Sequence, residues 1–162
     1  MPQKNQELLY QKCADLMAAY RRIAPTCTSQ KQAWKKVADS PAPRYYITHF
    51  QAYQRMLQMY KGDPAINELP LLKRRLFEAL YQTCIKMSQQ KEYLGLSLYQ
   101  LTQFAILQPA PSFFVSHTSM PRYYKIMKQY EKDHHRRFQY FYKNEYLKKN
   151  GCLLYTSDAA DE

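Results

Sequence analysis

Histidine is the side chain in this sequence best suited to metal binding or proton transfer, and the spacing of the four histidines favours neither use. His49 and His117 occupy equivalent places in two similar segments, and neither has a carboxylate at metal-ligand spacing. His134 and His135 are adjacent, so on a helix they point about 100° apart and cannot bind one ion together. We therefore expect no metal site.

Motifs that position other reactive groups are missing from the sequence. It contains no Gly-rich phosphate loop, nucleophile elbow or paired-carboxylate arrangement. Only thirteen residues are Asp or Glu, and three of these lie in the last eleven positions. We therefore expect a protein that is not an enzyme, with no catalytic residues, no cofactor and no small-molecule substrate.

Positive charge is the one feature that points to a partner. Lys and Arg number 24 against 13 Asp and Glu, which gives a formal net charge of +11. The cations cluster on predicted helix faces opposite the apolar stripes, a pattern that suits contact with phosphates. Protein surfaces usually intersperse both signs of charge. We therefore expect nucleic acid as the partner, with DNA favoured over RNA.

Two predicted helices, over residues 49–61 and 122–149, carry the candidate contact surfaces. The first offers amide, guanidinium and ammonium groups that suit base edges, at Gln51, Gln54, Arg55, Gln58 and Lys61. The second offers cations that suit phosphates, at Arg122, Lys125, Lys128, Lys132, Arg136, Arg137 and Lys143. The alternative function is a structural or protein-interaction adaptor that binds an acidic partner or self-associates through a Tyr-rich surface.

An internal repeat organises the elements that carry these residues. Residues 41–49 read Pro-Ala-Pro-Arg-Tyr-Tyr-Ile-Thr-His, and residues 109–117 read Pro-Ala-Pro-Ser-Phe-Phe-Val-Ser-His. Four of the nine positions are identical, and four others are exchanges between similar side chains. A repeat at a fixed spacing indicates one structural unit used twice.

The repeated segment is best interpreted as structural. Its prolines end a helix, its aromatic pair fills the core, and its hydroxyl residue caps the next helix. Because adjacent side chains of an extended segment face opposite sides, one aromatic of each pair should point inward. The two segments can then pair with each other across a pseudo-two-fold axis. The residues that define the motif are Pro41, Pro43, Tyr45, Tyr46 and Thr48, with Pro109, Pro111, Phe113, Phe114 and Ser116.

Apolar residues at three- and four-residue steps predict an all-α protein. Two tandem three-helix units are expected, with helices over 5–23, 30–38 and 49–61, then 71–90, 98–107 and about 120–149. Thr48 and Ser97 should cap their helices. Pro121 favours a start of the last helix after Thr118 or Ser119 rather than Ser116, because proline is tolerated only in a first turn.

These helices divide the chain into four expected regions: repeat unit 1 over residues 1–64, repeat unit 2 over 65–130, a basic helical extension over 131–151, and a terminal segment over 152–162. The order of a short helix, a break and a capped third helix is similar to a helix-turn-helix. However, about ten residues with two prolines separate the second and third helices, where that motif has a turn of three or four.

The sequence also bears on the compartment. Cys13, Cys27 and Cys84 are widely spaced and odd in number, which argues against a disulfide framework, and Cys152 lies in the terminal segment. No stretch of about 18 apolar residues predicts a membrane span, and residues 1–23 lack the apolar core of a signal peptide. We expect a cytoplasmic protein.

The repeated Pro-Ala-Pro element, with its helical flanks, resembles an uncharacterised family of small two-repeat proteins of gut bacteria and their phages or mobile elements. In that family the element commonly reads Pro-Ala-Pro-Arg-Phe-Tyr, followed by Val or Ile and by Ser or Thr. The resemblance covers most of residues 5–130 and implies no catalytic residues. This chain departs from the family at Ser112, where the Arg of the motif would match Arg44.

The last eleven residues, Cys-Leu-Leu-Tyr-Thr-Ser-Asp-Ala-Ala-Asp-Glu, resemble a translated sequencing adapter. We therefore expect residues 152–162 to be an artefact and the natural protein to continue past Gly151. Omitting these residues, which hold three acids and no Lys or Arg, raises the formal net charge from +11 to +14 over residues 1–151.

Overall fold

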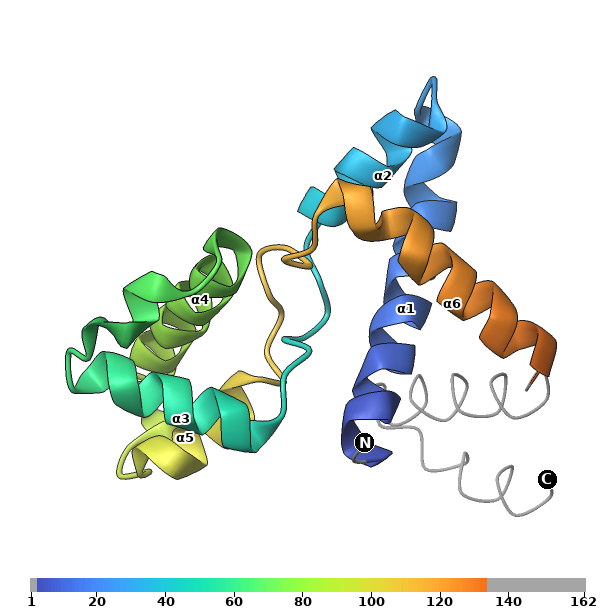
Figure 1. The fold of residues 1–162 in the computed structure, drawn as a ribbon. Helices are drawn as coiled ribbons and strands as arrows, with labels where there is room; N and C mark the ends of the chain where they lie inside the picture. Colours follow the sequence, from blue (N-terminus) through green and yellow to red (C-terminus); the bar gives the residue numbers. More distant parts are fainter. Residues whose placement is uncertain (1–2, 134–162) are drawn as a thin grey trace, which may run out of the picture.

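The computed structural model describes residues 3–133, which form α-helices joined by turns and extended connections (Figure 1). The helices are α1 (Gln3–Ile23), α2 (Gln30–Asp39), α3 (His49–Tyr60), α4 (Leu71–Ser88), α5 (Leu98–Ala105) and α6 (Met120–Asp133). Short 3-10 turns cover Ala24–Thr26, Pro64–Glu68, Lys91–Tyr93 and His117–Ser119. Within residues 3–133 no β-strand forms, and the all-α class is confirmed.

Helices α1 to α5 begin and end within two residues of the ranges that the periodicity predicts. Ser29 caps α2 and Thr48 caps α3, each accepting a backbone N–H with its hydroxyl oxygen. At α5, Ser97 and Gln100 form a capping box in which each side chain bonds the backbone N–H of the other residue. The first N–H groups of a helix lack partners within the helix, so these hydroxyls fix where each helix begins.

The start of α6 follows from Pro121. The helix begins at Met120, which places Pro121 in the tolerated first turn and confirms the later of the two predicted starts. The hydroxyl of Ser116 caps the preceding 3-10 turn, because Ser116 Oγ accepts from Thr118 N at 3.2 Å. Thr118 or Ser119 as the cap of α6 itself stays a prediction. The rest of the extension to residue 151, and the segment 152–162, lie outside the described residues.

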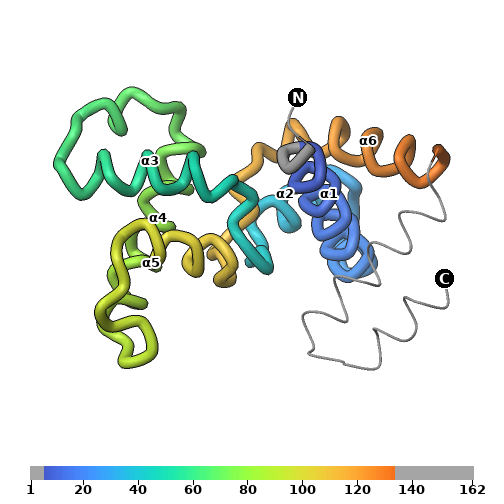
Figure 2. Tube along the Cα trace, turned by 90° about the horizontal axis from the view of Figure 1, so that it is seen from below, coloured from blue at the N-terminus to red at the C-terminus, as the bar shows by residue number. Residues whose placement is uncertain are grey.

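The helices pack into two groups that do not follow the order of the chain (Figures 1 and 2). α1 packs against α2 and α6, and the 3-10 turn before α6 packs against α2. α3, α4 and α5 all pack against one another. We name these groups the α1–α2–α6 bundle and the α3–α4–α5 bundle. Each bundle thus takes one helix from the other side of the connection between α3 and α4.

Residues 40–48 carry the chain out of the first bundle and into the second, so α2 and α3 lie in different bundles (Figure 1). These two helices therefore do not pack as a helix-turn-helix pair, because their connection spans the distance between bundles instead of making a tight turn. Residues 106–116 make the opposite crossing, from α5 to the turn before α6.

The two Pro-Ala-Pro segments meet where the chain crosses between bundles (Figure 1). Ala42 and Ala110 form an isolated antiparallel bridge, with Ala42 N donating to Ala110 O at 3.0 Å and Ala110 N donating to Ala42 O at 2.9 Å. Tyr45 N donates to Ile106 O at 2.9 Å. The expected pairing of the segments is therefore observed, but at the alanines and not along the aromatic residues.

Aromatic rings stack in pairs across this crossing. Tyr45 lies over Phe114 with ring centroids 6.4 Å apart, and Tyr46 lies over Phe113 at 6.0 Å. Tyr45 and Phe113 are buried, at 2% and 3% exposure, whereas Tyr46 and Phe114 are half-buried. The predicted alternation is thus correct, and each ring pairs with a ring from the other segment.

The two segments differ at the residue before the aromatic pair, and the structure gives a reason. Ser112 Oγ accepts from Phe114 N at 3.0 Å in the segment where Phe114 has φ +53°, a conformation that bulky residues rarely adopt. Arg44 instead donates from Nε to Tyr45 O at 3.1 Å. A short hydroxyl can close the tight turn at Phe114, and a long guanidinium cannot.

One continuous core joins the bundles through the crossing. It contains Leu16, Val37 and Met120 from the α1–α2–α6 bundle, Met56, Leu80 and Leu101 from the α3–α4–α5 bundle, and Ala42 and Ala110 between them. A smaller cluster under α6 consists of Cys13, Ala14, Met17 and Met127. Burial of these side chains is the main favourable term that holds the two bundles together.

Cutting the chain between α3 and α4 tests whether each bundle needs helices from both sides of this connection. A protease site inserted between Gly62 and Asp63 should give two fragments that stay together on size-exclusion chromatography, because each contributes helices to both bundles. After separation in urea, the fragment that ends at Gly62 should have little helical circular dichroism at micromolar concentration, since its α1 and α2 lack α6 and its α3 lacks α4 and α5. Mixing the two fragments should restore the signal. A first fragment that is helical and monomeric alone would contradict this dependence.

The hydroxyl of Tyr45 provides a second test. It lies 2.9 Å from Thr83 Oγ1, which itself donates to Ala79 O at 3.0 Å, so the tyrosine is the donor. Tyr45→Phe should lower the free energy of unfolding by about 1 kcal/mol, and Tyr45→Ala by about 3–5 kcal/mol, measured by urea denaturation. Tyr60→Phe is the control, because Tyr60 is 72% exposed and should change stability by less than about 0.5 kcal/mol.

Candidate nucleic-acid interface

Helix α6 presents four cations on one face. These cations recur at three- and four-residue steps and are all exposed; they are Arg122, Lys125, Lys128 and Lys132. Met127, on the opposite face, is fully buried against α1 in the cluster under the helix. Among residues 3–133 the structure places no carboxylate in an ion pair with any of the four cations. This face therefore offers positive charge that the described part of the chain does not neutralise.

Tyrosine rings lie beside these cations, between α6 and α1. The guanidinium carbon of Arg122 lies 5.7 Å from the ring centroid of Tyr123, and Lys128 Nζ lies 5.5 Å from that of Tyr124. Lys12 Nζ, from α1, is 5.1 Å from the Tyr123 centroid. Cation–π contact at these distances orders a long side chain without removing its charge. The sequence-based prediction did not single out Lys12, Tyr123 or Tyr124, although the adjacent tyrosines are visible in the sequence.

The tyrosines also hold the two helices together. Tyr10 of α1 and Tyr130 of α6 have ring centroids 4.1 Å apart, and Tyr20 and Tyr124 meet edge to face at 6.3 Å. Aromatic pairs of this kind contribute about 0.5–1.5 kcal/mol beyond the area that they bury. The Tyr-rich surface expected from composition thus serves in part as packing within the α1–α2–α6 bundle.

Further cations of the α1–α2–α6 bundle extend the positive charge. Arg21 and Arg22 are exposed in the last turn of α1, and Lys35 and Lys36 are exposed on α2. Arg21 forms an ion pair with Glu131 of α6 at 3.6 Å, which neutralises one of the two acids of that helix. The bundle consequently keeps a strong positive balance on its outer surface.

The candidate residues on α3 have mixed surroundings. Gln51, Gln54 and Lys61 are exposed. Arg55 and Gln58 are half-buried, and Arg55 Nη1 donates to Gln58 Oε1 at 3.0 Å while its guanidinium lies 5.8 Å from the Phe77 ring of α4. Of the five predicted base-reading residues, Arg55 therefore packs against a neighbouring helix, and Gln58 accepts a hydrogen bond from it.

The structure does not bring the two candidate surfaces together. α3 packs against α4 and α5, whereas α6 packs against α1, so the two helices belong to different bundles (Figures 1 and 2). Arg136, Arg137 and Lys143, the remaining candidates, lie outside the described residues. Among the described candidates for nucleic-acid contact, one cluster of cations thus lies on a single exposed face. It consists of Arg122, Lys125, Lys128 and Lys132.

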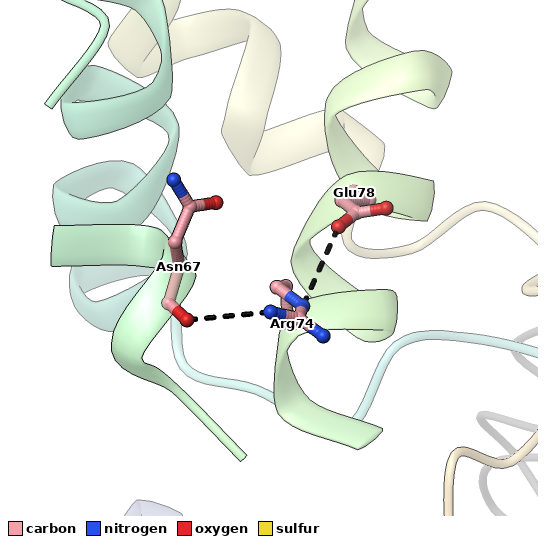
Figure 3. A network of polar contacts seen from close by, with 3 residues as sticks. All are labelled: Asn67, Arg74 and Glu78. Carbon is pink, nitrogen blue, oxygen red and sulfur yellow. Dashed lines mark hydrogen bonds and ion pairs between the residues drawn. The ribbon is translucent and has the colours of Figure 1, made fainter. Parts of the chain in front are cut away.

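A basic cluster on α4 is partly neutralised. Arg74 donates from Nη1 to the backbone oxygen of Asn67 at 3.3 Å and pairs through Nε with Glu78 at 3.9 Å (Figure 3). Lys73 and Arg75 beside it are exposed. The guanidinium of Arg74 thus connects the Pro64–Glu68 turn to α4, which makes this cluster less available to phosphates than that of α6.

The histidines of the repeat have packing contacts. His49 Nε2 lies 2.8 Å from the backbone oxygen of Tyr99, and its ring centroid lies 4.2 Å from that of Tyr99, so it joins α3 to α5. His117 lies in the 3-10 turn before α6. Across residues 3–133 no group of three or more His, Cys, Asp or Glu side chains could hold a metal ion.

Comparison with family models, curated proteins and solved structures finds no match to this chain. None of the helices in residues 3–133 has both the length and the apolar character needed to cross a membrane.

Cysteine reactivity tests the packing beneath the α6 face. Burial raises the pKa of Cys13 and of Cys84 to about 11, although Lys12 beside Cys13 and Thr102 beside Cys84 oppose the shift. At pH 8 only about one thiol in a thousand is then ionised. In a Cys152→Ser variant, a disulfide reagent should modify Cys27 fast and the two buried thiols slowly, whereas all three should react fast in guanidinium. Fast modification of Cys13 in the native protein would show that α6 does not cover α1.

Proposed function

We propose that the chain is a non-enzymatic nucleic-acid-binding protein of a phage or mobile element. The observation that carries this proposal is the exposed face of α6, where Arg122, Lys125, Lys128 and Lys132 gather without a neutralising acid among the described residues. Phosphates are the ligands that such a face attracts, through release of the counterions that surround nucleic acid. The net charge of +11 adds long-range attraction to any polyanion.

Within this proposal the α6 face provides affinity rather than sequence recognition. Lys and Arg contacts to phosphates position a protein on the duplex, whereas amide and guanidinium contacts to base edges specify the sequence. Gln51 and Gln54 of α3 remain the candidates for base contact, with Lys61 at the end of that helix. Because α3 lies in the other bundle, one duplex would have to pass along both bundles to meet both helices. DNA is favoured over RNA, and the protein acts in the cytoplasm.

We also propose that the fold arose by duplication of a three-helix unit, with units over residues 1–64 and 65–130 related by a pseudo-two-fold axis. Two observations support this proposal: the repeated Pro-Ala-Pro segments, and the reciprocal packing in which α3 joins α4 and α5 while α6 joins α1. The reciprocal pattern is that of an exchange of third helices between two copies of one unit, as in a domain-swapped dimer.

An adaptor that binds another protein is the second candidate function. The observation in its favour is that the α3–α4–α5 bundle exposes several large apolar side chains, such as Phe50 at 68% and Leu94 at 64%. Exposed apolar patches on a folded protein mark interaction sites. The two functions are compatible, because the apolar residues and the α6 cations belong to different bundles.

Binding to duplex DNA at increasing salt is the decisive measurement. If six or more phosphates are contacted, affinity for a labelled random-sequence duplex should fall about a thousandfold between 50 and 200 mM salt. A Lys125→Glu/Lys128→Glu/Lys132→Glu variant should bind at least about tenfold more weakly at 50 mM and lose roughly three units of the salt slope.

The matched control is Lys73→Glu/Arg75→Glu/Lys91→Glu, which makes the same change in net charge on exposed residues of the other bundle. Its affinity should change much less than that of the α6 variant. A further variant, Arg136→Glu/Arg137→Glu/Lys143→Glu, measures the contribution of the candidates beyond Asp133. Absence of binding at 50 mM salt, or equal effects of the α6 variant and its control, would reject the proposal.

A further inference from the structure

The exposed apolar side chains of the described residues gather in one bundle. The eight large ones are Phe50, Tyr60, Leu71, Ile85, Leu94, Tyr99, Phe104 and Leu107. Seven of them lie in α3, α4, α5 or the connections between these helices, Leu107 lies two residues after the end of α5, and none lies in α1, α2 or α6. The chain therefore separates its exposed apolar surface from its most basic helix.

Helix α5 forms the centre of this apolar surface. Leu101, Thr102 and Ala105 face the core, and the opposite side exposes Tyr99 at 51% and Phe104 at 45%. Leu107, two residues after the end of the helix, is 55% exposed. The only other exposed residues within the helix are two glutamines. Residues 93–121, which include the whole helix, contain no Asp, Glu, Lys or Arg. An uncharged outer face of this kind is unusual for a helix that contacts only water.

Two neighbouring side chains enlarge this surface. The His49 ring lies tilted against that of Tyr99, and the next residue along α3, Phe50, is 68% exposed. On the other flank the Tyr93 ring lies 5.8 Å from Phe104, and the next residue, Leu94, is 64% exposed. We define the α5 face as Phe50, Leu94, Tyr99, Phe104 and Leu107.

We propose that the α5 face binds the same face of a second copy of this chain, which makes a symmetric homodimer. A chain of net charge +11 repels its own copies, and most of its surface would place Lys and Arg side chains opposite one another. The α5 face avoids this repulsion because it carries no charge. An interface between identical patches must be complementary to itself, and an apolar surface without charge meets that condition.

The area of the face is sufficient for a weak dimer. A half-exposed aromatic or leucine side chain offers about 100 Å², so the five residues of the α5 face offer on the order of 500 Å² per copy. Standard interfaces bury about 800 Å² per partner, and weaker ones bury less. The dimer is therefore a reversible one, whose dissociation constant is on the order of micromolar.

Dimerisation at this face leaves the basic surface uncovered. α5 and α6 lie in different bundles (Figures 1 and 2), and they are not among the helix pairs that pack against each other. A symmetric dimer built on α5 would present two α6 faces, one on each copy. Two linked phosphate-binding surfaces hold a long polyanion more tightly than one surface does.

Analytical ultracentrifugation of the full chain tests the proposal. In high salt, which removes bridging by nucleic acid, the average mass should rise from monomer to dimer as the concentration increases to about 0.5 mM. Leu107→Lys and Phe104→Lys should each raise the dissociation constant at least about tenfold, because each places two like charges in the interface. Leu71→Lys is the matched control, since Leu71 is 49% exposed in the same bundle but outside the α5 face; it should leave the dimer unchanged.

Thermal unfolding and circular dichroism should show that each lysine variant keeps the fold, since the substituted side chains are exposed. A wild-type chain that stays monomeric at the highest concentration would overturn the proposal, as would a dimer that persists unchanged in both α5 variants. These outcomes leave the proposed DNA binding untouched, because that binding is measured with dilute protein on variants of the other bundle. Loss of DNA binding in the α6 variant likewise says nothing against the dimer.

Discussion

The paired backbones of Ala42 and Ala110 are the constraint on which the arrangement of this protein depends. Each alanine stands between two prolines, in a segment that can be neither helix nor long strand, and both alanines are buried. A buried backbone must find partners for its N–H and C=O groups, and each of these two residues finds them in the other. The small side chain lets the two backbones come together inside the core, so the segments must cross at this point.

The crossing explains why the bundles mix helices from the two halves of the chain. Each segment leaves one bundle and enters the other, so the helix that follows it packs beside helices that are distant in sequence. The rings of Tyr45 and Tyr46 stack on Phe114 and Phe113, which closes the crossing on both sides. Because one core runs through the crossing, neither half of the chain has a complete core of its own.

Cations on different helices have different roles because of what packs beside them. Arg55 lies over Phe77, and Arg74 connects a turn to its helix, so these guanidinium groups support the fold. Lys125 and Lys132 project from α6 on the side away from Met127, where no helix among the described residues covers them. The same residue types thus stabilise the α3–α4–α5 bundle and leave open charge on α6.

The sequence by itself determined the positions of the helices, the caps Thr48 and Ser97, and the fact that one aromatic of each repeated segment points inward, because these depend on periodicity, on proline and on a hydroxyl within three residues. It also identified the cations of α6, which three- and four-residue spacing places on one face. Only the tertiary structure decided that α3 packs against α4 and α5 while α6 packs against α1, that Arg55 is engaged in packing, and that the uncharged face of α5 lies open. Those outcomes depend on contacts between residues more than 20 positions apart, such as Arg55 with Phe77 and Ala42 with Ala110, and no local pattern encodes such contacts.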